Sequence, residues 1–207
     1  PVRGKPIMEH TIELLRKNDI RDILIVVGYL GDKIKKHFGS GEQLGVNIIY
    51  HEENRVLGTG RIVKDLRKYI NNEPFLLIYG DVLAEIDLKD FINYHKSNDG
   101  LATVALTSIK DPSAYGVVDL KGNRIVGFAE KPEVGNKLSH LISSGIFIFE
   151  PEVMDVIPKG NNSKLEEDVL PKLAKEGKLY GYPFEGKWYD VGTPEIYERV
   201  IKEWKVD

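Results

Sequence analysis

The sequence predicts an α/β protein with a mixed, mainly parallel sheet flanked by helices and a small β-hairpin lobe. Two observations support this prediction. Helix-like and strand-like segments alternate over residues 1–110, and the segments after Lys110 alternate in hydropathy as hairpin strands do. The 207 residues suffice for a sizeable core, and no linker-like stretch divides them. We therefore expect a single domain over residues 1–207.

The first half alternates four helical segments with four strand-like segments. The strand-like segments are continuous apolar runs, which are typical of strands buried on both faces. Short connections between such elements imply right-handed parallel crossovers. The series begins with a helix, whereas a doubly wound domain normally opens with a strand and a glycine-rich turn, so we expect the first strand to be absent. The expected helices are 7–18, 32–37, 59–69 and 87–96, the last of them capped by Asp87. The expected strands are 22–28, 45–51, 74–80 and 101–107.

The second half has a different hydropathy pattern from the first. Two alternating segments, 115–120 and 124–129, flank a Lys-Gly-Asn turn and predict a hairpin. A further apolar strand is expected over 141–150 and a short strand-like piece over 186–191. Ser163 and Glu166 have the spacing of a capping box, which predicts a helix reaching Lys175. Thr193 followed by proline predicts the start of the last helix.

Composition narrows the possible functions. The chain has 29 Lys and Arg against 32 Asp and Glu, a formal net charge of −3, which argues against nucleic-acid binding driven by bulk charge. It has no Cys, which excludes disulfides, thiolate metal sites and a cysteine nucleophile. No apolar run approaches the ~20 residues of a membrane span, and no signal peptide opens the sequence. We expect no membrane association and a cytoplasmic location.

Two aspartates stand where a metal ion could bind. Asp81 follows Gly80 directly after a buried strand, and Asp190 lies between a strand-like piece and the last helix. Open α/β sheets bind ligands at the carboxyl ends of their strands, and carboxylates are natural Mg²⁺ ligands. Both residues are equally compatible with ordinary turns, because Gly and Asp form turns readily. Spacing alone does not show whether the two carboxylates meet.

A glycine-rich turn and a lysine are the other candidates. Gly58, Thr59 and Gly60 follow a strand and open a helix, so their backbone can approach a base or a phosphate closely. A flexible loop explains the same pattern. Lys131, between Glu130 and a proline, is suited to bind a phosphate, although most lysines are solvated surface residues.

Taken in order, eight motifs resemble the sugar-1-phosphate nucleotidylyltransferase family over essentially the whole chain, most closely its mannose-1-phosphate and heptose-1-phosphate guanylyltransferase branches. That resemblance implies a Rossmann-like fold in which residues 1–110 bind the nucleotide and residues 111–207 bind the sugar phosphate. The motifs are PVRGKPIMEH, LGTG, PFLLIYGDVL, AYGVV, EKP, SSGIFIF, LEEDVLPKLA and WYDVGTPEIY.

The resemblance implies the transfer of a nucleotidyl group from a nucleoside triphosphate to a sugar 1-phosphate, giving an NDP-sugar and pyrophosphate. Asp81 and Asp190 would hold Mg²⁺, and Lys131 would bind the phosphate of the sugar. The remaining implied substrate-binding residues are Gly58, Thr59 and Gly60 at the base, Gly80 beside the metal, and Gly116, Glu130, Gly145 and Glu166 at the sugar.

The leading interpretation is GTP with mannose 1-phosphate. The alternatives are a glucose-1-phosphate thymidylyl- or uridylyltransferase and a non-catalytic regulatory relative. The sequence departs from the family in three ways: the N-terminal strand and triphosphate loop are missing, Arg61 and Ile62 replace small residues, and Ser143 replaces an Asn at the sugar. A sheet without its central strand exposes unpaired strand edges. We therefore also expect the chain to associate with a partner, for example as a homo-oligomer.

Overall fold

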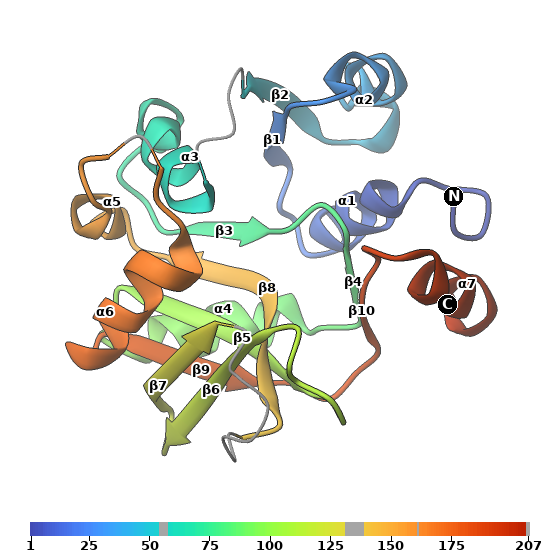
Figure 1. Cartoon of the computed structure of the whole chain (residues 1–207). Coiled ribbons are helices and arrows are strands. Elements are labelled where there is room, and N and C mark those ends of the chain that lie inside the picture. Colours follow the sequence, from blue (N-terminus) through green and yellow to red (C-terminus); the bar gives the residue numbers. More distant parts are fainter. Residues whose placement is uncertain (54–57, 131–138, 161, 206–207) are drawn as a thin grey trace.

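A computed structural model describes all residues except 54–57, 131–138, 161, 206 and 207. Helices lie on both sides of a central six-stranded sheet, and two smaller sheets flank it (Figure 1). The expected mixed α/β class with flanking helices is therefore confirmed. The chain ends lie close together, since the Tyr197 hydroxyl donates to Pro1 O (2.7 Å) and Arg3 Nε donates to Trp204 O (2.9 Å).

The six-stranded sheet has the order β3-β8-β5-β9-β7-β6. The expected hairpin is present, because β6 and β7 pair antiparallel around a turn at Gly122. The strand β9 was not predicted. The strands of this sheet are β3 (Phe75–Ile78), β5 (Ala102–Ser108), β6 (Gly116–Lys121), β7 (Arg124–Glu130), β8 (Leu141–Phe149) and β9 (Leu179–Pro183).

The prediction of mainly parallel pairing is wrong for the described strands. Only β5–β9 and the separate pair β1 (Asp22–Val27) with β2 (Asn47–Glu52) are parallel. The reason is the position of β8, which lies antiparallel between β3 and β5. These two strands therefore run in the same direction, as a crossover through a helix requires, but they are not neighbours.

Two short strands form a third, antiparallel sheet. β4 (Val82–Ala84) pairs with β10 (Trp188–Asp190), so the segment after β3 lies beside the segment before the last helix. β10 corresponds to the expected strand-like piece at 186–191, whereas β4 was not predicted, because three residues carry no periodic signal. This pairing brings Asp190 of β10 beside the turn that holds Asp81, directly before β4.

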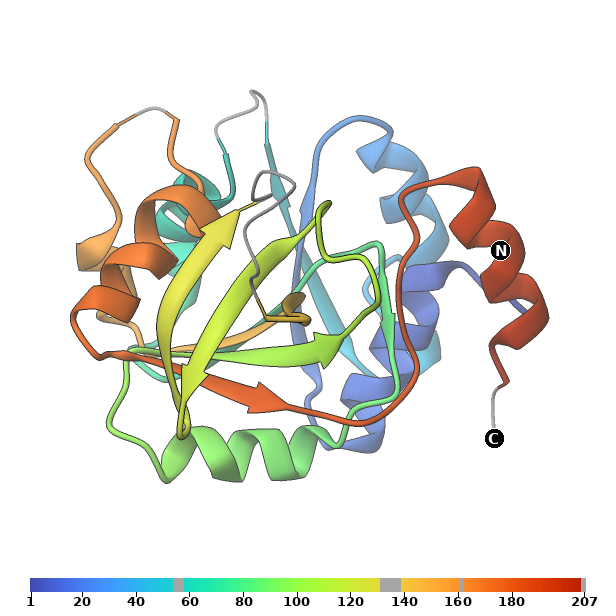
Figure 2. The same cartoon turned by 60° about the horizontal axis from the view of Figure 1, so that its bottom comes forward.

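The helices cover both faces of the main sheet, and α4 runs beneath it in Figure 2. Phe91 of α4 packs with Ala105 on one face, while Leu170 and Leu173 of α6 pack with Val104 on the other. The helices are α1 (Ile7–Lys17), α2 (Gly31–Phe38), α3 (Thr59–Asp65), α4 (Leu88–Lys96), α5 (Val153–Val156), α6 (Leu170–Lys175) and α7 (Pro194–Glu203), with 3₁₀ turns at Glu42–Leu44 and Leu66–Tyr69 and a π-helix at Leu165–Val169.

Helix starts test the capping predictions. Asp87 and Thr193 cap α4 and α7, since their side chains accept from Asp90 N and Ile196 N. The capping box is wrong: Ser163 Oγ has no partner among the described residues, and the segment Leu165–Val169 begins as a π-helix without a side-chain cap. The reason is that the carboxylate of Glu166 bonds elsewhere, as the site geometry shows.

Two strands keep an unpaired edge. Among the described strands, β1 pairs only with β2, and β3 pairs only with β8. Ile23 of β1 and Ile78 of β3 nevertheless pack against the same buried cluster, and all four residues of β3 are only partly buried. These edges fit the expectation that the sheet lacks a central strand.

Candidate functional site

The first part of the site is the turn that follows β3. Tyr79 N donates to Gly145 O of β8 (3.0 Å), and Val82 N donates back to Tyr79 O (3.1 Å). This tight turn leaves Gly80 and Asp81 exposed at the carboxyl end of the strand. The location agrees with the prediction that ligand-binding groups follow this strand.

Asp190 lies in β10, beside the turn that holds Asp81 just before β4. Asp190 is paired in register with Val82, the residue after Asp81, and Val191 N donates to Asp81 O (2.9 Å). Among the residues that the structure describes, no group of three His, Cys, Asp or Glu side chains could hold a metal ion. Two carboxylates are enough protein ligands for Mg²⁺, because this ion keeps several waters and takes substrate phosphates as its remaining ligands.

Tyr115 lies near Asp190. Its ring meets the Trp188 ring edge-on, with centroids 5.4 Å apart. Burial, and then the negative charge of Asp190, raise the pKa of the Tyr115 hydroxyl. Tyr115 is therefore a neutral hydrogen-bond donor near the aspartate pair at neutral pH.

The glycine turn at residues 58–60 packs against a second chain segment. A Cβ at Gly58, whose φ is +81°, would lie 2.4 Å from Ser163 O, and a Cβ at Gly60 would lie 2.8 Å from Ser163 Oγ. The N–H groups of Gly60 and Arg61 both donate to Ser163 O (2.8 and 3.1 Å). These two amides are thus used within the protein, and close packing by itself explains both glycines.

Glu166 is the centre of the site's hydrogen bonds. The Tyr79 hydroxyl donates to Glu166 Oε1, and the Thr59 hydroxyl donates to Glu166 Oε2 (3.0 Å). Thr59 Oγ1 also accepts from Leu165 N (2.9 Å). The carboxylate is therefore held at both oxygens by side chains from two different segments, which explains why it does not cap its own helix. Glu166 lies in a π-helix, an irregularity that is frequent at functional sites.

Tyr79 was not predicted as a site residue. Burial, followed by the charge of Glu166, holds the pKa of its hydroxyl well above the ordinary value, so it remains a proton donor. Its ring lies against Gly145, where an added Cβ would be 3.0 Å from Tyr79 Cδ2 at φ +75°. The available sequence signal was an aromatic residue directly before the Gly-Asp pair at the end of a buried strand.

Gly116 and Glu130 lie on the hairpin strands and face each other. They are paired in register, and a Cβ at Gly116 would lie 2.9 Å from Glu130 Oε2. Glu130 also acts on the pKa of the Tyr79 hydroxyl through its charge, which places it near the Glu166 cluster. The hairpin therefore brings a second carboxylate to the same region.

Three further residues that the sequence analysis singled out are Lys131, Arg61 and Ser143. Lys131 lies outside the described residues. The Arg61 guanidinium donates to Asp65 Oδ1 (3.0 Å) and Gly160 O (3.2 Å), so these contacts direct it toward its own helix and the 160 region. Ser143 Oγ accepts from Gly145 N at 3.5 Å, which places it beside the glycine under Tyr79.

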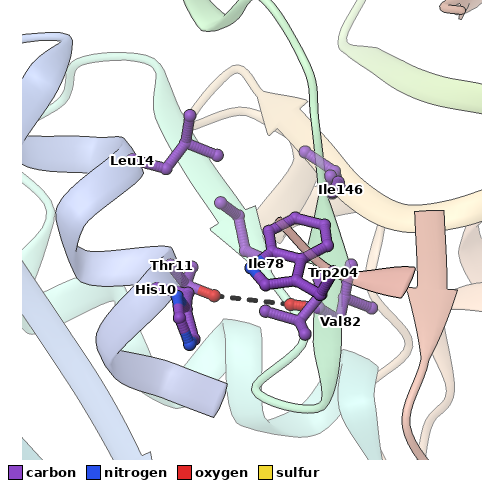
Figure 3. A pocket seen from close by; sticks show the side chains of 9 residues that line it. His10, Thr11, Leu14, Ile78, Val82, Ile146 and Trp204 are labelled. Atoms are coloured by element: carbon purple, nitrogen blue, oxygen red, sulfur yellow. Dashed lines mark hydrogen bonds between the residues drawn. The ribbon is translucent and has the colours of Figure 1, made fainter. Parts of the chain in front are cut away.

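A small cavity lies elsewhere, between α1 and β4 (Figure 3). His10, Thr11 and Trp204 line it together with aliphatic side chains, and the Thr11 hydroxyl donates to Val82 O at 3.4 Å. Its volume of about 20 Å³ has room for roughly one water molecule. It is too small for a nucleotide or a sugar.

Glycine-lined turns and carboxylates at the end of a strand are typical of α/β proteins that bind small ligands at the carboxyl end of a sheet. The chain matches the nucleotidyl transferase family over residues 1–205 and belongs to it. This result confirms the family resemblance seen in the sequence.

Curated relatives support this assignment. The chain is 34% identical to mannose-1-phosphate guanyltransferase beta-A of Xenopus laevis over 199 residues, covering 94% of this chain and 54% of the relative. It is 33% identical to UTP–glucose-1-phosphate uridylyltransferase of Synechocystis over 217 residues, covering 98% and 56%. The chain thus spans about half the length of the curated relatives it matches.

Solved structures share the fold. A putative glucose-1-phosphate thymidylyltransferase from Bacillus anthracis superposes with a TM-score of 0.89 at 24% identity, over 100% of this chain and 87% of the other. HddC from Yersinia pseudotuberculosis, complexed with GMP-PN, gives 0.83 at 25% identity over 99% and 88%. None of the helices in the described ranges has the length and apolar character of a membrane span.

Proposed function

We propose that this chain carries a site that transfers a nucleotidyl group from a nucleoside triphosphate to a sugar 1-phosphate. One observation carries the proposal: the fold brings the glycine turn, the Glu166 cluster and the aspartate pair to the end of β3. The reaction needs in-line positioning and charge neutralisation rather than a protein nucleophile. Carboxylates would serve that purpose by holding a divalent cation, which would neutralise the phosphate charge.

Asp81 and Asp190 would hold Mg²⁺. Bound there, the ion would neutralise phosphate charge during the transfer. The support for this role is the pairing of β4 with β10, which brings the backbone of Asp190 beside the turn that carries Asp81. Tyr115, kept neutral, would donate a hydrogen bond near them.

The remaining predicted roles divide between the two halves of the chain. Residues 1–110 would bind the nucleotide, and residues 111–207 would bind the sugar phosphate within one domain. Glu130 and Glu166 suit sugar hydroxyls, because carboxylates accept hydrogen bonds from them. The full set comprises Gly58, Thr59, Gly60 and Gly80 for the nucleotide, Gly116, Glu130, Gly145 and Glu166 for the sugar, and Lys131 for its phosphate.

GTP and mannose 1-phosphate are the proposed pair. The guanyltransferase beta-A of Xenopus laevis supports this choice, and HddC complexed with GMP-PN supports nucleotide binding. The uridylyltransferase of Synechocystis keeps a glucose-1-phosphate substrate as the alternative. Cytoplasmic location and homo-oligomerisation stay predictions from the sequence.

Pyrophosphate release tests the proposal. The full chain is supplied with Mg²⁺ and with GTP plus mannose 1-phosphate or UTP plus glucose 1-phosphate. Asp81→Asn should reduce turnover about 100-fold with an unchanged thermal midpoint, because an amide is a poorer Mg²⁺ ligand than a carboxylate. Asp32→Asn is the matched control, since that side chain is fully exposed on α2.

The outcomes separate two readings. Release with one pair, lost in Asp81→Asn and kept in Asp32→Asn, supports the enzyme and identifies its substrates. No release from the folded chain with either pair leaves two explanations, a truncated enzyme and a non-catalytic relative, and repeating the assay with the upstream residues restored separates them. Full activity of Asp81→Asn removes Asp81 from the mechanism.

A further inference from the structure

The glycine turn and the segment that carries Glu166 are joined through Thr59. Its hydroxyl donates to Glu166 Oε2 and accepts from Leu165 N, and it also lies in hydrogen-bond contact with the Tyr79 hydroxyl. The N–H groups of Gly60 and Arg61 add two bonds to Ser163 O. Because neither glycine leaves space for a Cβ against Ser163, the two segments are in close contact and should move together.

Tyr79 holds the other oxygen of Glu166 from a separate element. Its backbone N–H is bonded to Gly145 O, and its ring lies against Gly145 of β8. Tyr79 thus belongs to the main sheet, whereas Thr59 belongs to α3. Glu166 therefore lies between a fixed anchor and a link to the glycine turn.

We propose that Thr59 is a positioning residue that couples nucleotide binding at the glycine turn to sugar-phosphate binding at Glu166, with Tyr79 as the anchor. The inference rests on the proposed function, because it assigns the nucleotide to the turn and the sugar to the carboxylate. A nucleotide that orders residues 58–60 also orders Glu166 through Thr59. The sugar phosphate then meets a carboxylate that is already positioned, so its affinity rises.

The coupling is reciprocal and measurable. If a nucleotide tightens sugar-phosphate binding by some factor, the sugar phosphate must tighten nucleotide binding by the same factor. Couplings between sites typically amount to about 5- to 150-fold. For a link made by one hydroxyl, we expect a factor of about 5 to 10 in the unsubstituted chain.

The test is a calorimetric titration of the full chain with mannose 1-phosphate. Each titration is run with and without Mg²⁺ and a GTP analogue that cannot transfer its nucleotidyl group. Thr59→Val should reduce the ratio of the two Kd values to about 1, whereas Thr59→Ser, which keeps the hydroxyl, should retain it. Tyr79→Phe should raise both Kd values about threefold to tenfold and leave the ratio unchanged.

The outcomes distinguish this inference from a structural role and from the proposed function. A purely structural role of Thr59 would lower the thermal midpoint and weaken both titrations equally. A Thr59→Val ratio equal to that of the unsubstituted chain, or loss of the ratio in Thr59→Ser, overturns the inference alone. An unsubstituted chain that binds neither this pair nor UTP with glucose 1-phosphate overturns the proposed function and this inference with it.

Discussion

Two of the glutamate-centred hydrogen-bond networks in the described part of the chain look alike in composition. One joins Glu166 to Thr59 and Tyr79 at the end of β3. The other joins Glu150 to His95, whose Nε2 lies 3.2 Å from Glu150 Oε1 and whose Nδ1 lies 2.7 Å from Thr103 Oγ1. Each contains one carboxylate, one threonine and one ring.

The two networks differ in what surrounds them. His95 belongs to the last turn of α4, a regular helix, and its partners lie at the start of β5 and just beyond β8. Glu166 lies in a π-helix and is surrounded by glycines that allow chains to approach closely. The two networks have similar polar residues but different backbone surroundings. Local backbone irregularity, rather than the set of polar residues, therefore distinguishes the candidate ligand site from the structural network.

The largest effect that we expect is a loss of enzymatic activity when Glu166 is replaced by Gln. Glu166→Gln keeps the size of the side chain but removes its charge, and its amide N–H₂ faces a hydroxyl donor. We expect kcat/KM for the sugar phosphate to fall about 30- to 100-fold, the equivalent of one charge-assisted hydrogen bond, with little change in thermal midpoint. The measurement is pyrophosphate release with varied sugar phosphate.

Glu150→Gln is the matched control in the second network. It should leave kcat/KM unchanged, because Glu150 lies beyond the end of β8 away from Gly145. Equal losses of kcat/KM in both variants would contradict the distinction between the two networks and would show that the Glu166 network is structural.

A smaller effect is expected on stability at the glycine turn. Gly58→Ala places a Cβ 2.4 Å from Ser163 O at a φ of +81°, so both packing and backbone oppose it. We expect the free energy of unfolding to fall by about 2 kcal/mol, measured by urea denaturation. Gly160→Ala, with no atom within 4 Å of its Cβ, should change it by less than about 0.5 kcal/mol. Equal effects would show that close packing does not explain Gly58.

Much of this architecture was predictable because buried strands and capped helices have local signals. The apolar run ending at Ile78 predicted both a strand and a ligand site at its end, and Asp87 and Thr193 cap the helices they were expected to cap. The strand neighbours were not predictable, because the insertion of β8 between β3 and β5 depends on contacts between distant segments.

The site shows the same limit. The Ser163–Glu166 spacing satisfies a capping box, yet Thr59 and Tyr79, more than 80 residues earlier, take both oxygens of Glu166. The glycine pattern predicted close approach correctly, and within the protein the group approached is Ser163 O. In both cases the contacting group comes from a distant part of the chain, so a local sequence pattern could not predict it.

The smallest expected effect concerns pH and the second network. His95 is 3% exposed, and this burial lowers its pKa despite the neighbouring Glu150. In the unfolded chain its pKa is about 6.5, so between that value and the lower folded value the unfolded chain binds more protons. The contribution of His95 to the free energy of unfolding should therefore be fully present above pH 6.5. It should fall as the pH drops below 6.5, by at most about 1.4 kcal/mol per pH unit.

Urea denaturation from pH 5 to 8 measures this loss in the unsubstituted chain and in His95→Gln. The difference between the two curves isolates the histidine, and His37→Gln, at an exposed position on α2, should leave the slope unchanged. The Glu166 network contains no histidine, so the comparison assigns any slope lost in His95→Gln to the second network alone. A slope that survives in His95→Gln would mean that the carboxylates, rather than His95, titrate with folding.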